Sequence, residues 1–168
     1  ASATQIHCGG ATAGTANADT TALYLSTTRV GIGTSAPSGE LNIASASTQV
    51  YIDTHAAGAS SILNFRRSRH TDIGTFTTAV QTDNELGTIN FQGTDGDSVE
   101  TGAQIVSRAN QAWSGSARGS YIDFYTTDDD STGQDHRMRI DHNGYIGMGT
   151  AAPTSPLSVE RNLVDGAD

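Results

Sequence analysis

Acidic residues are the most plentiful charged side chains in this 168-residue sequence, and their carboxylates could hold a ligand. Asp95, Asp97 and Glu100 lie close together, and three consecutive aspartates occupy 128–130. A protein-bound Ca²⁺ takes about six to eight oxygen ligands, and an EF-hand loop supplies them at a D-x-D-x-D-G spacing followed by a distant glutamate. Neither acidic segment has this spacing. Both are therefore interpreted as solvated turns, and the sequence predicts no metal site there.

Histidine is the second type of metal ligand to consider. His136 and His142 each follow an aspartate, Asp135 and Asp141, so an Asp–His pair is conceivable. One histidine per chain near the axis of a three-chain assembly would also place three nitrogens around Zn²⁺ or Fe²⁺. No His-x-His pattern occurs, so surface positions are the favoured interpretation and no metal or cofactor is predicted. The five histidines are His7, His55, His70, His136 and His142.

The residues that catalysis would need are not arranged for it. A hydrolase needs a nucleophile beside a base, or a pair of carboxylates. The sequence contains no G-x-S-x-G motif, and spacing singles out no carboxylate pair. We therefore predict no catalytic residue and no enzymatic activity.

Aromatic side chains could bind a receptor, because their rings stack on sugars. Partly buried packing is the favoured interpretation, and three of them are kept as candidate receptor contacts. The aromatic residues considered are Trp113, Tyr121, Tyr125 and Tyr145, of which the first three are the candidates.

Composition limits the partners and the fold. The nine basic residues are all arginine, and 18 acidic residues give a net charge of -9, which disfavours nucleic acid and anionic membranes. No apolar run approaches the ~20 residues that span a bilayer. Only 29 residues are Leu, Ile, Val or Phe, so the core of a single chain is thin. Because strand-like patterns are nevertheless present, we expect identical chains to complete the core.

The elements that position these residues are predicted to be strands. The chain is rich in Thr, Gly, Ser and Asp and lacks helical periodicity, which indicates an all-β fold. Turns are expected at 92–98, 114–119, 128–134 and Asn143–Gly144. Strands are expected at 23–25, 29–34, 41–43, 50–52, 61–65, 73–80, 86–91, 103–109, 121–127 and around 138–140.

Two patterns recur within the chain. Residues 30–43 (VGIGTSAPSGELNI) align without a gap on 146–159 (IGMGTAAPTSPLSV). The glycines are expected to bare one face of a strand so that the backbone of a symmetry mate can approach, and the prolines to end the strand. The predicted structural residues are Gly31, Gly33, Pro37, Gly147, Gly149 and Pro153. A shorter pattern, apolar–polar–Phe, occurs at 63–65, 89–91 and 122–124.

These motifs resemble the stalks of phage tail fibres and tail spikes. The resemblance rests on RVGIGTSAPSGELNI (29–43), YIGMGTAAPTSPLSV (145–159), ELGTINFQGTDG (85–96), GAQIVSRANQAWS (102–114) and the run from GSYIDFYTTDDD through RMRI and NG to GMGTAAP (119–153). It implies an elongated, intertwined homotrimeric fibre with short strands, carried on the virion and adhering to host cells. The expected partners are two identical chains, other virion tail proteins and a host-surface polysaccharide or protein receptor.

The resulting hypothesis is a structural, non-enzymatic tail-fibre segment. It has a linker or shaft start at 1–22, a first shaft motif at 23–50, a sandwich-like or meander knob-like domain at 51–143, and a second motif with the start of a further segment at 144–168. Loops 66–72, 92–102, 114–119 and 128–136 are the expected contact surfaces. The alternatives are a polysaccharide-depolymerising spike, a capsid decoration protein and a non-phage trimeric adhesin.

Overall fold

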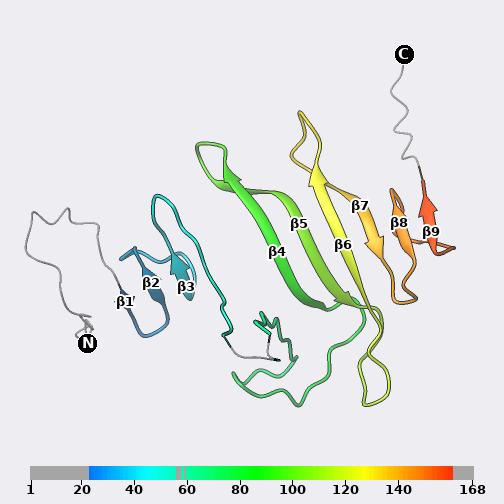
Figure 1. Ribbon diagram of the computed structural model, residues 1–168, viewed down its shortest axis with the longest axis horizontal. Coiled ribbons are helices and arrows are strands. Elements are labelled where there is room, and N and C mark those ends of the chain that lie inside the picture. Colours follow the sequence, from blue (N-terminus) through cyan, green and yellow to red (C-terminus); the bar gives the residue numbers. More distant parts are fainter. Residues whose placement is uncertain (1–22, 56–57, 59, 161–168) are drawn as a thin grey trace, which may run out of the picture. The chain divides into compact units, whose positions relative to one another are not determined.

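The computed structural model describes residues 23–55, 58 and 60–160, and these residues form nine strands and no helix (Figure 1). The prediction of an all-β fold is therefore confirmed. The linker predicted for 1–22 and the further segment predicted beyond 160 lie outside the described residues. None of the described residues belongs to a helix long and apolar enough to cross a membrane. The chain divides into two compact units, with the boundary between Leu63 and Asn64.

The first unit contains a three-stranded sheet. Its strands are β1 (Tyr24–Leu25), β2 (Val30–Ile32) and β3 (Leu41–Ile43), in that order across the sheet. β1 and β2 are antiparallel and joined by a turn in which the Ser26 hydroxyl accepts the main-chain N–H of Arg29 at 3.0 Å. β2 and β3 are parallel, so the loop between them must carry the chain back to the same end.

The second unit is a six-stranded sheet whose strand order follows the sequence. Neighbouring strands are antiparallel from β4 to β8, and only β8 and β9 are parallel. Of the two predicted arrangements, the structure therefore has the meander. The strands are β4 (Glu85–Thr94), β5 (Val99–Ala109), β6 (Ser120–Thr127), β7 (Gln134–Ile140), β8 (Ile146–Met148) and β9 (Leu157–Val159).

Polar side chains shape the turns between these strands. At the β4–β5 tip the Asp95 carboxylate accepts the main-chain N–H groups of Asp97 and Ser98, both at 2.9 Å. Asp141 does the same for Asn143 and Tyr145 in the turn after β7, both at 2.8 Å. Gly144 in that turn has a φ of 80°, which favours glycine. The predicted Asn143–Gly144 turn is thus confirmed.

Three predicted strands are not strands in the structure. Residues 50–52, 61–65 and 73–80 join no sheet, although their sequences alternate in the expected way. A strand needs a neighbour to accept and donate a series of hydrogen bonds. The described part of the chain gives these segments only isolated main-chain bonds, such as those from Arg69 to Thr78 and from Trp113 to Val80. Apart from Val80, which is buried, their large apolar side chains are exposed, Ile73 completely.

The core of the single chain is thin, as the composition predicts. Among the described residues the buried hydrophobic side chains are Val80, Val106, Ala109 and Tyr121. The second copy of the repeated motif continues the sheet of β4–β7 as β8 and β9. The four segments predicted as domains stay predictions.

Candidate functional site

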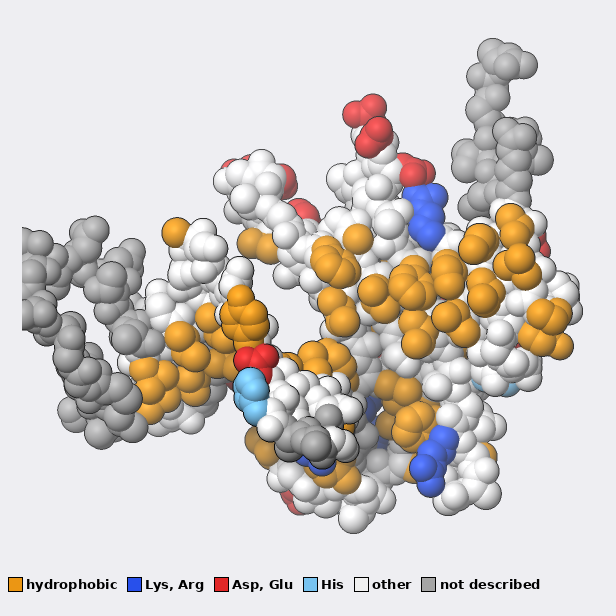
Figure 2. Space-filling model, in the orientation of Figure 1, with side chains coloured by type: hydrophobic (Ala, Val, Ile, Leu, Met, Phe, Trp, Pro, Cys, Tyr) orange, Lys and Arg blue, Asp and Glu red, His pale blue; other side chains and the backbone are white. Residues whose placement is uncertain are grey.

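One face of the six-stranded sheet carries apolar side chains from edge to edge. Strand register aligns these side chains in two rows that run across the sheet, and we call this surface the apolar face. One row consists of Ile89, Ile105, Phe124, Met138, Met148 and Val159, and the next contains Ile122, Ile140, Ile146 and Leu157. Figure 2 shows hydrophobic side chains gathered over this sheet.

The apolar face is open to solvent in the single chain. Met148 is 45% exposed, Leu157 58% and Val159 68%. The two rows contain no charged side chain; Arg137 and its partners Asp128 and Asp135 border the face at the β6–β7 end. A contiguous apolar surface of this kind is a candidate interaction site.

The opposite face is polar and is organised around a buried carboxylate. Asp123 in β6 has no exposed side-chain surface. Arg139 in β7 donates two hydrogen bonds to it, from Nε at 2.6 Å and from Nη2 at 2.7 Å. His136 Nε2 lies 3.0 Å from the same carboxylate, the Tyr125 hydroxyl donates at 3.3 Å, and Arg108 Nη1 in β5 lies 3.7 Å away. We call these five residues the Asp123 cluster.

Electrostatics in the Asp123 cluster favour the ionised form of the Asp123 carboxyl group. Burial opposes ionisation of Asp123, but the hydrogen bonds from Arg139 and His136 outweigh it and hold its pKa below the usual value. The guanidinium of Arg139 also stacks on the Tyr121 ring, 4.0 Å from its centroid. The cluster ties β5, β6 and β7 together on the face away from the apolar rows, and a fully buried carboxylate offers a substrate no access.

From the sequence, the conceivable partners of His136 and His142 were the aspartates that precede them, Asp135 and Asp141. In the structure His136 contacts Asp123 on the neighbouring strand β6. Its sequence neighbour Asp135 pairs instead with Arg137, whose Nη2 lies 3.2 Å from the Asp135 carboxylate. The Asp141 carboxylate accepts main-chain N–H groups of its own turn. No group of three or more His, Cys, Asp or Glu residues is placed to hold a metal within the described ranges.

The glycines of the repeated motif have a role other than the predicted one. A Cβ atom at Gly31 would collide with the carbonyl oxygen of Thr34, and one at Gly147 with that of Thr150. Gly33 and Gly149 both have a φ of 74°, and a Cβ there would meet the carbonyl oxygens of Ala44 and Glu160. The backbone that approaches the glycines is therefore the chain's own, and the expectation of a symmetry mate at this point is corrected.

The prolines lie in the loop that folds over these glycines. The Pro37 carbonyl accepts a hydrogen bond from Arg29 Nη1 at 2.7 Å, and in the second loop the Ala151 carbonyl accepts one from Arg139 Nη1 at 2.8 Å. Pro153 Cδ lies 3.4 Å from where a Cβ at Gly147 would be. Both copies thus fold as a strand, a covering loop and a parallel strand.

The aromatic receptor candidates lie in different surroundings. Tyr121 is buried beneath Arg139 and donates its hydroxyl to Asp83 at 3.0 Å, and Tyr125 belongs to the Asp123 cluster. Their hydroxyls are therefore already engaged within the sheet. Trp113 is half-buried and lines an open groove with Arg67 and Phe76.

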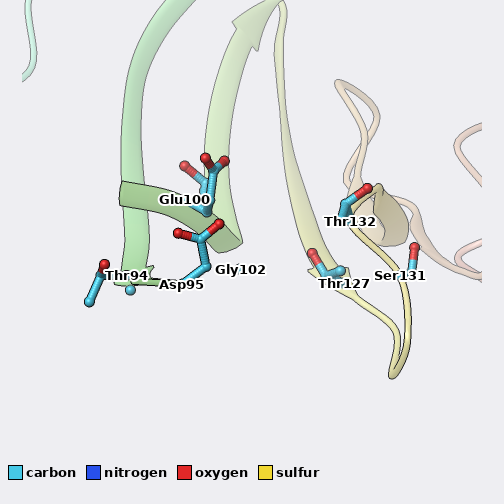
Figure 3. Close-up of a pocket in the computed structure, with 9 residues that line it drawn as sticks. Thr94, Asp95, Glu100, Gly102, Thr127, Ser131 and Thr132 are labelled. Atoms are coloured by element: carbon cyan, nitrogen blue, oxygen red, sulfur yellow. The ribbon is translucent and has the colours of Figure 1, made fainter. Parts of the chain in front are cut away.

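A second groove lies between the β4–β5 tip and the β6–β7 loop (Figure 3). It has a volume of about 550 Å³ and is lined by Asp95, Glu100, two glycines and several hydroxyl side chains. Hydrogen bonds from the main-chain N–H groups of Ser98 and Asp97 lower the pKa of Asp95. Glu100 accepts the Ser98 hydroxyl at 2.7 Å, so both carboxylates already have partners within the hairpin.

Comparison with known proteins finds similarity in structure only. No protein-family model and no curated protein matches this chain. The carboxy-terminal domain of the bacteriophage T5 L-shaped tail fibre matches with a TM-score of 0.55 and 16% identity, over 68% of this chain and 44% of that one. The structure of that domain with its intramolecular chaperone domain matches with the same TM-score and identity, over 68% of this chain and 30% of that one.

The chain thus spans less than half the length of either solved chain. At 16% identity the likeness concerns the fold. The chain has the all-β fold of a phage tail-fibre domain.

Proposed function

We propose that this chain is a structural, non-enzymatic segment of a homotrimeric phage tail fibre that is carried on the virion and serves attachment to the host cell surface. The observation that carries the proposal is the open apolar face of the six-stranded sheet. Two further copies of the chain are its occupants, and the tail-fibre fold supports the setting.

Charge favours the apolar face as the place where copies meet. Each chain carries a net charge of -9, so identical chains repel one another over most of their surfaces. The two apolar rows lack charge, and complete burial of each large side chain there contributes about 1.5–3 kcal/mol. Three chains around one axis would each bury this face and keep the polar face in water. Support for three copies comes from the resemblance of the repeated motif to homotrimeric fibre stalks.

The experiment measures the mass of the intact chain in solution by size-exclusion chromatography with light scattering. The wild type should give three times 17.4 kDa. Met148→Asp should abolish this species, because it puts a charge on the apolar face at a side chain that is exposed within its own chain. Asn90→Asp adds the same charge to the polar face, where the oxygen still accepts the amide of Gln104, and should stay trimeric. A well-folded wild-type monomer would refute the proposal.

The depolymerase alternative has one feature to test, the carboxylates of Asp95 and Glu100 in the groove of Figure 3. A glycosidase general acid needs a raised pKa, whereas hydrogen bonds lower that of Asp95, which disfavours Asp95 in the acid role. Asp95 accepts the main-chain N–H groups of Asp97 and Ser98, and Glu100 accepts the Ser98 hydroxyl, so the hydrogen bonds of both carboxylates favour a structural hairpin. An assay for new reducing ends on capsular polysaccharide separates the two functions. Imaging the place of the chain on a particle separates a fibre from a decoration protein or an adhesin.

A further inference from the structure

A concentration of positive charge lies just before the six-stranded sheet. Three of the nine arginines of this acidic chain are Arg66, Arg67 and Arg69, and all three are exposed. Within the described ranges, the ion pairs of arginine involve only Arg108, Arg137 and Arg139. The three clustered guanidinium groups therefore keep their positive charge uncompensated by a carboxylate of the described chain.

Nearby carboxylates are already engaged. Glu85 accepts a hydrogen bond from Arg108 at 2.6 Å, and Asp83 accepts the Tyr121 hydroxyl at 3.0 Å. Asp72 is 78% exposed and forms an ion pair with none of the three arginines. Arg67 reaches the main-chain carbonyl of Glu85 at 3.1 Å, which fixes its position through Nη1 and leaves its other N–H groups free to bind a ligand.

The arginines border a groove with aromatic walls. Arg67, Phe76 and Trp113, together with residues 77–80 and 114–115, line a groove of about 340 Å³, within the range typical of small-ligand sites. The Arg66 guanidinium lies 4.9 Å from the centroid of the Phe76 ring, and Phe76 is 53% exposed. The main-chain N–H of Arg69 donates a hydrogen bond to the carbonyl oxygen of Thr78, a lining residue, which places this arginine beside the groove. We call the lining residues with Arg66 and Arg69 the arginine groove.

Trp113 is held in place before any ligand arrives. Its main-chain N–H donates to Val80 at 3.0 Å, and its indole N–H donates to Gly119 at 3.2 Å. The tryptophan ring is thus a fixed wall of the groove. Groove hydroxyls from Thr77, Thr78 and Ser114 add donors and acceptors along the same surface.

We infer that the arginine groove binds an anionic carbohydrate, one whose sugar ring carries a carboxylate or a phosphate. Arginine binds both groups through paired N–H donors, and aromatic rings pack against sugar rings. Nucleic acid is a poorer fit, because the rest of the chain is strongly negative. The inference deepens the proposed function, since it rests on attachment to a cell surface and names the chemistry that is recognised.

The experiment is calorimetric titration of the intact chain with three probes: tetragalacturonate, its fully methyl-esterified form and inorganic phosphate. Tetragalacturonate should bind in a salt-sensitive way, and the methyl ester, which keeps the sugar rings but lacks charge, should bind at least tenfold more weakly. If inorganic phosphate binds as well, an anionic group is sufficient for binding. If tetragalacturonate binds and phosphate does not, the sugar ring is also needed for binding. Both outcomes support the arginine groove.

Two variants locate the site. Arg67→Gln should weaken tetragalacturonate binding about tenfold or more, as expected for the loss of a charge-assisted hydrogen bond. Arg137→Gln is the matched control, because it removes the same charge from strand β7, outside the arginine groove, and it should bind like the wild type. Phe76→Ala should also weaken binding, because it removes the exposed ring.

The oligomeric mass, measured on the same samples, separates the inference from the proposed function. A trimer that binds neither tetragalacturonate nor phosphate overturns the inference and leaves the proposed function standing. Equal binding of the acid and its methyl ester also overturns it. Dissociation of the trimer by Arg67→Gln would show that the arginines contact acidic residues of another copy, which overturns the groove as a receptor site. A monomer that binds the acid selectively upholds the groove and refutes the trimer.

Discussion

Asp123→Asn tests whether the buried cluster holds the sheet together. Asparagine has nearly the same shape as aspartate, so packing is preserved while the charge is removed. Arg139 would lose the ionic partner of two hydrogen bonds of 2.6 and 2.7 Å, and Arg108 would lose the charge that lies 3.7 Å away. An amide N–H₂ group would also face the guanidinium donors of Arg139, which cannot accept its hydrogen bonds.

The expected loss of stability is large because the carboxylate is fully buried. Removal of one partner from a buried ion pair costs about 3–5 kcal/mol, and the lower end applies here because the guanidinium that stays behind is 21% exposed. For a chain of this length each kcal/mol lowers Tm by about 2–4 °C. Asp123→Asn should therefore lower Tm by at least about 6 °C.

Thermal unfolding followed by circular dichroism measures this shift. Asp128→Asn is the matched control, because Asp128 is 63% exposed and its partner Arg137 is 37% exposed. Exposed pairs contribute about 0–1 kcal/mol, so the control should lose less than about 4 °C. Equal shifts for the two variants would refute the reasoning, because they would mean that the Asp123 cluster is as hydrated as a surface pair.

Three further predictions concern the motif, acid and metal. Gly147→Val should lower Tm clearly, because the valine Cβ would meet the Thr150 carbonyl. Gly93→Val, at a strand position with open space, should not lower it. Equal melting curves for the two variants would contradict this prediction. Since the pKa of Asp123 is lowered on folding, its stabilisation is present above about pH 4 and is lost as the pH falls through that lowered pKa. Asp123→Asn should therefore flatten the acid limb of a stability–pH curve, and an unchanged limb would count against it. A chelator should leave Tm unchanged. An ion bound at 100-fold saturation would add about 2.7 kcal/mol to the free energy of unfolding. A fall in Tm of several degrees on chelation, abolished by Asp95→Asn, would therefore reveal a metal site.

Local patterns in the sequence predict the paired strands well. Alternation of apolar residues located β4 to β7, and the Asn-Gly turn located the hairpin after β7, because these features act between neighbours in sequence. The same alternation misplaced strands at 50–52, 61–65 and 73–80. Alternation reports a preference for an extended chain, but a strand forms only where another backbone completes its hydrogen bonds. The apolar–polar–Phe pattern is in strands at 89–91 and 122–124 but not at 63–65 for the same reason.

The Asp123 cluster was not predicted from the sequence. Its members come from three strands, and the bulge between Phe124 and Tyr125 brings His136 beside Tyr125. Register of this kind depends on long-range pairing, so adjacency in sequence suggested Asp135 as the partner of His136 instead. A weak signal was available in Tyr121, Asp123 and Tyr125, which alternate on one side of β6 as polar side chains that need partners.

The repeated motif separates folding of the chain from its assembly. In both copies the glycine side of the strand is occupied by the motif's own loop, so that side has no room for another chain. The open side is apolar in both, with Ile32 41% and Leu41 62% exposed in the first copy and Met148 45% and Leu157 58% exposed in the second. Contacts between copies of the chain should therefore form on the apolar side at both positions. Valine at Gly147 would disturb the chain before it assembles, whereas aspartate at Met148 would leave the chain folded and remove the contact. This division requires two results. The Gly147 variant should be unfolded, and the Met148 variant should be folded but monomeric.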